Sequence, residues 1–205
     1  MKFVLEYRIM RKARIIISLC LILIFDQHTF GQNRKAHAFL FDDFRAFVVT
    51  NDGGIDEYGN AYLMLAHYHT LMFPNDSIPA NSQNGTSFSL CKIKPDGDLY
   101  WFSQPSHFFY FPELYFAENS IYCEGGFRDT IEWAGSTFIA TNHPDSIFES
   151  DLLLLKFDLD GNLIYSHQFH PNVIQISNLT EYKGNLYFTG VFEDQIILGN
   201  DTLIE

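Results

Sequence analysis

A segment centred on a tyrosine occurs three times in this sequence and constrains its fold more than any other feature. The copies contain Tyr62, Tyr122 and Tyr187, which lie 60 and then 65 residues apart. Repeats of this length are typical of folds whose units cannot bury their apolar faces alone and must stack on a neighbour. The repeat therefore favours an extended interaction surface over a single active site.

The second and third copies align over two separate blocks. Residues 120–139 align with 185–204 at an offset of 65, and residues 88–104 align with 152–168 at an offset of 64. One nearly constant register over both blocks is hard to obtain by chance. The downstream identities are Tyr122/Tyr187, Gly125/Gly190, Phe127/Phe192, Asp129/Asp194, Ile131/Ile196, Thr137/Thr202 and Ile139/Ile204. The upstream identities are Leu90/Leu154, Lys92/Lys156, Asp96/Asp160, Gly97/Gly161, Leu99/Leu163 and Gln104/Gln168.

The first copy is weaker. It keeps Tyr62 and the apolar alternation of Leu71 and Phe73, but it lacks the Gly-x-Phe element. His67 stands where the other copies carry phenylalanine. We favour three copies, and two true copies preceded by an ordinary strand pair is the alternative.

Each unit reads as four short strands. Residues 87–93 and 152–157 are apolar and rich in strand-forming residues, and each run leads into an Asp-Gly pair that favours a hairpin turn. The returning strands, and then a third and a fourth strand, are predicted at 99–103, 114–117 and 121–127 in one unit and at 163–168, 174–179 and 186–192 in the next. A short extra pair, 130–133 with 137–139, carries the chain onward. No sustained helical period is found in residues 32–205.

Four antiparallel strands per unit, repeated along the chain, describe the blade of a β-propeller. The 21 Phe, 11 Tyr and two Trp residues suit packing between blades, because large flat side chains fill the space between twisted sheets. A β-sandwich would use the same residues, but the long repeat favours the propeller. We therefore expect an all-β fold of antiparallel, four-stranded, blade-like repeats that form a partial β-propeller.

The repeat resembles the bacterial secreted β-propeller repeats, often called SBBP repeats. The similarity is carried by LLLLKFDLDGNLIY at residues 152–165 and GNLYFTGVF at residues 184–192, and it extends over roughly residues 55–205. This resemblance implies a secreted or surface protein with a propeller module. It implies no catalytic residue.

The expected organisation is a signal peptide at residues 1–31 and a repeat region at residues 32–205, with units at about 38–80, 86–140 and 151–205. Closed propellers contain about four to eight blades. Truncation of a longer protein, closure by oligomerisation and an open stack are the alternatives. We favour truncation, because open stacks expose edges that can pair with other strands.

The first 31 residues read as a secretion signal. Arg8, Arg11, Lys12 and Arg14 precede an apolar run at residues 15–25, which is short for a bilayer span but typical of a signal peptide. Cleavage is expected after Gly31, with an uncleaved anchor helix as the alternative. The predicted location is therefore outside the cell or at its surface, without membrane insertion after cleavage.

The remaining chain is strongly acidic. Without residues 1–31 it has eight basic and 23 acidic residues, a net charge of −15. This balance argues against binding of nucleic acid, whose phosphates require basic side chains, and against anionic lipid surfaces. We expect an unknown protein or glycan as the partner.

Few residues qualify for chemistry. No catalytic motif or cofactor site is identified, and we expect none. His67 and His69 lie two apart on a predicted strand and are weak candidates for metal ligands, with no third ligand evident. The run Asp158-x-Asp160-Gly-Asn162 resembles the start of a calcium loop, but a hairpin turn explains it better.

Two cysteines, Cys91 and Cys123, follow the leader. Export would permit a disulfide between them. Because their repeat equivalents are the apolar Leu155 and Phe188, we favour two small buried residues with free thiols.

Three functions remain open. The leading one is a secreted, non-enzymatic repeat module that binds proteins or glycans at the cell surface. Its binding loops would be the insertions 105–109 and 141–150, which fall between the matched blocks. The second is a fragment of a secreted hydrolase whose catalytic residues lie outside this chain. The third is a structural spacer within a larger surface protein.

Overall fold

The computed structural model describes residues 21–24, 37–40, 46–48, 53–81, 85–107, 109–117, 119–141, 150–169, 173–192, 195–198 and 201–204. All regular elements in these ranges are β-strands, and all strand pairs are antiparallel. Within the same ranges, no helix has the length and apolar character needed to cross a membrane. The all-β, antiparallel expectation is confirmed.

The first sheet has the order β3-β5-β8-β9, and β4 also pairs with β5. A small hairpin, β6–β7, lies between β5 and β8 in the chain. The bounds are β3 Ala46–Val48, β4 Gly54–Ile55, β5 Ala61–His67, β6 Leu71–Met72, β7 Ser77–Ile78, β8 Ser87–Ile93 and β9 Leu99–Ser103.

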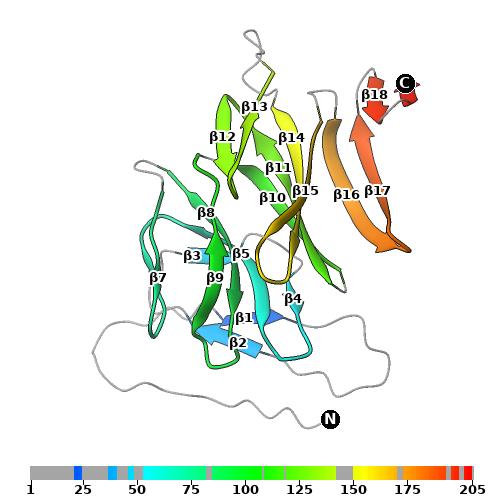
Figure 1. The fold of residues 1–205 in the computed structure, drawn as a ribbon. Helices are drawn as coiled ribbons and strands as arrows, with labels where there is room; N and C mark the ends of the chain where they lie inside the picture. Colours follow the sequence, from blue (N-terminus) through cyan, green and yellow to red (C-terminus); the bar gives the residue numbers. More distant parts are fainter. Residues whose placement is uncertain are drawn as a thin grey trace.

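The second sheet repeats this plan with the order β10-β11-β14-β15 and the hairpin β12–β13 after β11 (Figure 1). The bounds are β10 Tyr110–Ala117, β11 Ser120–Phe127, β12 Thr130–Trp133, β13 Ser136–Ile139, β14 Asp151–Asp158 and β15 Leu163–Phe169.

A third copy of the plan is described as far as its hairpins. The strands β16 and β17 pair with each other, and a short hairpin, β18–β19, follows. Near the N-terminus, β1 and β2 form another two-stranded sheet. Part of the apolar run of the predicted signal peptide is therefore a strand. The bounds are β1 Leu21–Ile24, β2 His37–Leu40, β16 Val173–Tyr182, β17 Asn185–Phe192, β18 Gln195–Leu198 and β19 Asp201–Ile204.

The sheets combine strands from two predicted units. We expected β8, β9, β10 and β11 to form one sheet, but β8 pairs with β5 and β11 pairs with β14. The small hairpins explain the difference, since β12–β13 turns the chain back so that β14 can lie beside β11. The 104–109 connection instead carries the chain from the first sheet to the second.

The two large sheets and the β16–β17 hairpin form successive layers. One core cluster lies between the first and second sheets and joins Tyr62, Met64 and Leu90 to Leu153 and Phe157. Another lies between the second sheet and the hairpin and contains Leu152, Leu154 and Ile176. A third, which includes Leu63, Leu65 and Ile78, covers the other face of the first sheet.

Burial on both faces explains the continuous apolar runs. Every residue of β5, β8 and β11 is buried, whereas an open sheet with one wet face would alternate apolar and polar residues. Stacking of the repeats is thus visible in the core. The described layers lie against one another, and no ring is closed among the strands that the structure describes.

The Asp-Gly turns form as expected. In the turns 94–98 and 158–162 the glycines, Gly97 and Gly161, have φ angles of 87° and 88°. A third turn of the same kind, with Gly59 at 84°, joins β4 to β5. Each places glycine in the left-handed region that this hairpin requires.

Candidate functional site

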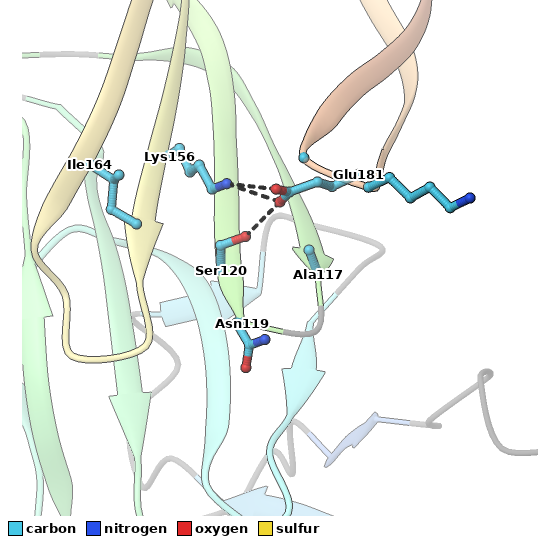
Figure 2. A pocket seen from close by; sticks show the side chains of 8 residues that line it. Ala117, Asn119, Ser120, Lys156, Ile164 and Glu181 are labelled. Atoms are coloured by element: carbon cyan, nitrogen blue, oxygen red, sulfur yellow. Dashed lines mark hydrogen bonds and ion pairs between the residues drawn. The ribbon is translucent and has the colours of Figure 1, made fainter.

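A cleft lies between the second sheet and the β16–β17 hairpin (Figure 2). Its volume is about 280 Å³, slightly below the usual range of small-molecule pockets. The lining residues are Ala117, Asn119, Ser120, Lys156, Ile164, Glu181, Lys183 and Gly184.

An ion pair spans this cleft. The Nζ of Lys156 on β14 lies 3.0 and 2.9 Å from the two carboxylate oxygens of Glu181 on β16. The hydroxyls of Ser120 and Tyr122 on β11 donate to the same carboxylate at 3.2 and 2.9 Å. Lys156 also lies over the Tyr122 ring, with Nζ 5.1 Å from its centroid. We name these residues the second Tyr–Lys–acid cluster.

The electrostatics hold this cluster in its charged form. The hydrogen bond from Lys156, and then that from Tyr122, lowers the pKa of Glu181. Burial opposes the charge of Lys156, but its hydrogen bonds with Tyr122 and Glu181 outweigh burial and raise its pKa. Lys156 therefore keeps its proton at neutral pH and is poorly suited to act as a base or nucleophile.

The first sheet contains the same arrangement in a buried form. Lys92 lies opposite Tyr62 in the strand register, as Lys156 lies opposite Tyr122. Its Nζ is again 5.1 Å from the ring centroid. Asp56 accepts the Tyr62 hydroxyl at 3.0 Å and lies 3.5 Å from Lys92. This is the first Tyr–Lys–acid cluster.

Both clusters also bind the next layer of the stack. Lys92 and the indole of Trp101 each donate to the carbonyl oxygen of Leu159 at 3.2 Å, and Leu159 belongs to the β14–β15 turn of the second sheet. In the second cluster, Glu181 comes from β16 of the next hairpin. The lysines therefore connect successive layers as well as neighbouring strands.

Sequence reasoning found part of these clusters. The repeated tyrosines and lysines were identified by their spacing, but the acids were missed. Phe116 and Glu181 occupy equivalent positions at the offset of 65, and Phe116 packs on Tyr62 with ring centroids 5.2 Å apart. Because one copy uses an aromatic ring and the other a carboxylate, the alignment gives no signal at this position.

Both ring nitrogens of His67 form hydrogen bonds. Its Nδ1 is 2.8 Å from the carbonyl oxygen of His69, and its Nε2 is 2.7 Å from the Ser89 hydroxyl. A carbonyl can only accept, so Nδ1 carries the proton and Nε2 accepts from Ser89. Burial lowers the pKa of His67 and keeps the ring neutral. No group of three or more metal-binding side chains is found in the described parts of the chain.

The repeated glutamines hold the small hairpins. Gln104, directly after β9, donates to the carbonyl of Pro79 at 2.9 Å, and Gln168 on β15 donates to the carbonyl of Ile139 at 2.8 Å. These carbonyls follow β7 and end β13, so the two bonds are equivalent. The identity Gln104/Gln168 thus has a structural explanation.

The disulfide candidate is not formed. Cys91 and Cys123 are both buried free cysteines, in β8 of the first sheet and β11 of the second. They face different core clusters, and burial raises the pKa of both thiols. The favoured alternative, two small buried residues, agrees with this placement.

The remaining sequence candidates have structural roles. The Asp158 carboxylate accepts from the backbone NH of Asp160 and from both the backbone and side-chain amides of Asn162, as a hairpin turn requires. In the 105–109 insertion, Ser106 pairs with Glu132 of β12, and Phe109 is fully buried. This insertion is therefore a packed connection. Most of the other insertion, residues 142–149, lies outside the described residues.

A buried carboxyl group was not predicted. Glu124 on β11 is 2% exposed and lies directly opposite Glu113 on β10. Its Oε1 lies 3.5 Å from the Tyr115 hydroxyl, and its Oε2 forms no hydrogen bond with any residue that the structure describes. Burial, and then the charge of Glu113, raises the pKa of Glu124 to about 8. The side chain is therefore mostly protonated at neutral pH.

Comparison with known proteins gives no relative, since no known family, curated protein or solved structure matches this chain.

Proposed function

We propose that this chain is a secreted, non-enzymatic repeat module that binds proteins or glycans at the cell surface, built as part of a propeller-type stack of sheets. One observation carries the proposal. The polar residues that recur between units serve to join strands and layers, as Lys92, Lys156, Gln104 and Gln168 do. A repeat preserved for such contacts supports a scaffold.

The chemistry of the polar clusters supports the same conclusion. Lys156 is protonated and paired with Glu181, and His67 is buried with both nitrogens bonded. Catalytic acids and bases need a pKa near the working pH and access to a substrate. Glu124 meets the first condition, but it is buried between two layers.

Exposed aromatic residues on the outer strands are the proposed binding residues. Tyr100 on β9 is 56% exposed and Tyr165 on β15 is 47% exposed, each on the last strand of its sheet. Aromatic side chains are enriched at protein interfaces, and their faces also stack on sugar rings. The net acidity of the chain favours neutral or basic partners.

The test uses the chain on an array of cell-surface polysaccharides and purified surface proteins. Saturable binding without substrate turnover is expected, and Tyr165→Ala should weaken it without lowering thermal stability. Tyr58→Ala serves as the matched control, because Tyr58 is 76% exposed but lies in the turn between β4 and β5, outside the cleft. Turnover of any glycan by the isolated chain would overturn the proposal in favour of a hydrolase. Failure to bind any partner would favour the structural spacer. The structural role of the recurring residues also agrees with a spacer.

A further inference from the structure

The strand β17 is the third member of a series. It aligns with β5 and β11, and the three strands contain Tyr187, Tyr62 and Tyr122. On one side, β5 pairs with β8 and β11 pairs with β14. Among the strands that the structure describes, β17 pairs only with β16. Its outer edge corresponds to the edge that is occupied in both earlier copies.

Exposure changes with this pairing. Tyr62 and Tyr122 are 0% and 2% exposed, but Tyr187 is 53% exposed, as is Val191 on the same strand. The sequence of β17 is as apolar as that of its equivalents, with three aromatic residues among its eight. A strand with the composition of an interior strand therefore lies at an edge, where such strands bind further strands.

The other sheet edges differ from this one. The strands β9 and β15 also lie at sheet edges, but they are equivalent strands and both copies leave them at the edge. Since neither copy pairs this strand with a further described strand, its open edge is a regular feature of the repeat. Only at β17 does the series of equivalent strands predict a partner that is not among the described strands.

The earlier copies specify the chemistry of that partner. In β8 and β14 the residue opposite the tyrosine is a lysine, Lys92 or Lys156, whose Nζ lies 5.1 Å from the ring centroid in both. Four residues before each lysine are buried, and an Asp-Gly hairpin follows. Charge, register and turn are thus common to both occupants.

We propose that the outer edge of β17 binds an antiparallel strand of the same repeat type, an apolar run that ends in Lys-x-x-x-Asp-Gly, with its lysine over the ring of Tyr187. Main-chain hydrogen bonds along β17 provide affinity, and the lysine fixes the register. This site is distinct from the proposed binding of proteins or glycans, because it would exist even if the module bound neither.

The probe is a synthetic peptide with the sequence of residues 151–169, which is the β14–β15 hairpin of this chain. Fluorescence anisotropy of the labelled peptide should show saturable binding to the full chain. Tyr187→Ala should weaken binding about tenfold, since a desolvated cation–π contact accounts for a change of that size. Tyr182→Ala is the matched control, because Tyr182 is 60% exposed but lies in the adjoining strand at the turn. It should leave binding unchanged.

A crosslink tests the register independently. In the second sheet Glu124 lies opposite Leu154, and Glu124 is equivalent to Thr189 at the offset of 65. A Thr189→Cys chain should therefore form a disulfide with a peptide carrying Leu154→Cys. A peptide carrying Leu155→Cys should react poorly, because neighbouring residues in a strand point to opposite faces.

Three results would overturn the proposal. The first is no binding at peptide concentrations of several hundred micromolar. The second is equal loss of binding in the two tyrosine variants. The third is a chain that forms dimers through β17 alone, which sedimentation of the Thr189→Cys chain after oxidation would reveal.

Discussion

At the scale of single residues, the two Tyr–Lys–acid clusters contain similar side chains that differ in how deeply they are buried. The side chains of Lys92 and Asp56 are 8% and 7% exposed, whereas those of Lys156 and Glu181 are 20% and 26% exposed. A buried ion pair loses more when one partner is removed, because the remaining charge stays out of water. The same substitution should therefore have unequal effects in the two copies.

We expect Lys92→Met to lower the free energy of unfolding by about 3 kcal/mol, since it leaves the Asp56 carboxylate without its cation. Lys156→Met should cost roughly 1 kcal/mol, because water reaches Glu181. Urea unfolding at neutral pH measures both. Equal losses would show that burial does not distinguish the clusters.

The second residue-scale prediction concerns pH. The pKa of Glu124 is raised from 4.5 to about 8 in the folded chain, so the folded state holds a proton that the unfolded state releases. This proton stabilises the folded chain fully below about pH 4.5. The stabilisation is lost as pH rises towards 8, by up to about 1.4 kcal/mol per pH unit.

Glu124→Gln should remove this loss, so the variant should be more stable than the parent at pH 7.5 and lack its decline between pH 5 and 8. Unfolding curves across that range provide the measurement. Glu113→Gln is the companion variant; its decline should end at a lower pH and be smaller in total, because the charge of Glu113 raises the pKa of Glu124 in the folded chain. A parent chain with flat stability over this range would contradict the assignment.

At the scale of elements, the turns were the most predictable part of the sequence and the sheets were less so. Asp-Gly pairs report on local backbone geometry, and both formed the expected hairpins. Which strands share a sheet depends on contacts between residues far apart in the sequence, such as Glu124 with Leu154. A repeat does not show at which strand one sheet ends and the next begins. The acids Asp56 and Glu181 could not be identified for a similar reason, since they come from different elements in the two copies.

Two equivalent turn glycines allow a controlled test. Gly97 and Gly161 have φ angles of 87° and 88°, but a Cβ at Gly161 would lie 2.9 Å from the Trp101 ring, whereas one at Gly97 would meet nothing within 4 Å. Gly97→Ala should cost about 1–2 kcal/mol from backbone strain alone. Gly161→Ala should cost more, and thermal unfolding measures the difference. Equal costs would mean that Trp101 moves aside freely.

At the scale of the whole molecule, stability should vary from layer to layer. Among the residues whose burial the structure describes, the cluster between the first and second sheets contains sixteen buried residues, and that between the second sheet and the β16–β17 hairpin contains five. Layers that bury more apolar surface open less often. This difference leads to a prediction for hydrogen exchange.

Amides of β5, β8, β11 and β14 should exchange slowest, and those of β17 should exchange much faster. Mass spectrometry of the exchanging chain, with digestion into short peptides, resolves these strands. Addition of the 151–169 peptide should slow exchange in β17 specifically. Uniform protection across all layers would instead indicate that the chain opens as one cooperative body.

The bonds between layers also give the assembly a direction. Lys92 reaches the carbonyl of Leu159 and Lys156 reaches the carboxylate of Glu181, so in each case the cation lies on the earlier layer and the acceptor on the later one. The two ends of such a column are chemically unlike. Copies that joined by this bonding would have to add head to tail, which generates rings or filaments and excludes a twofold dimer.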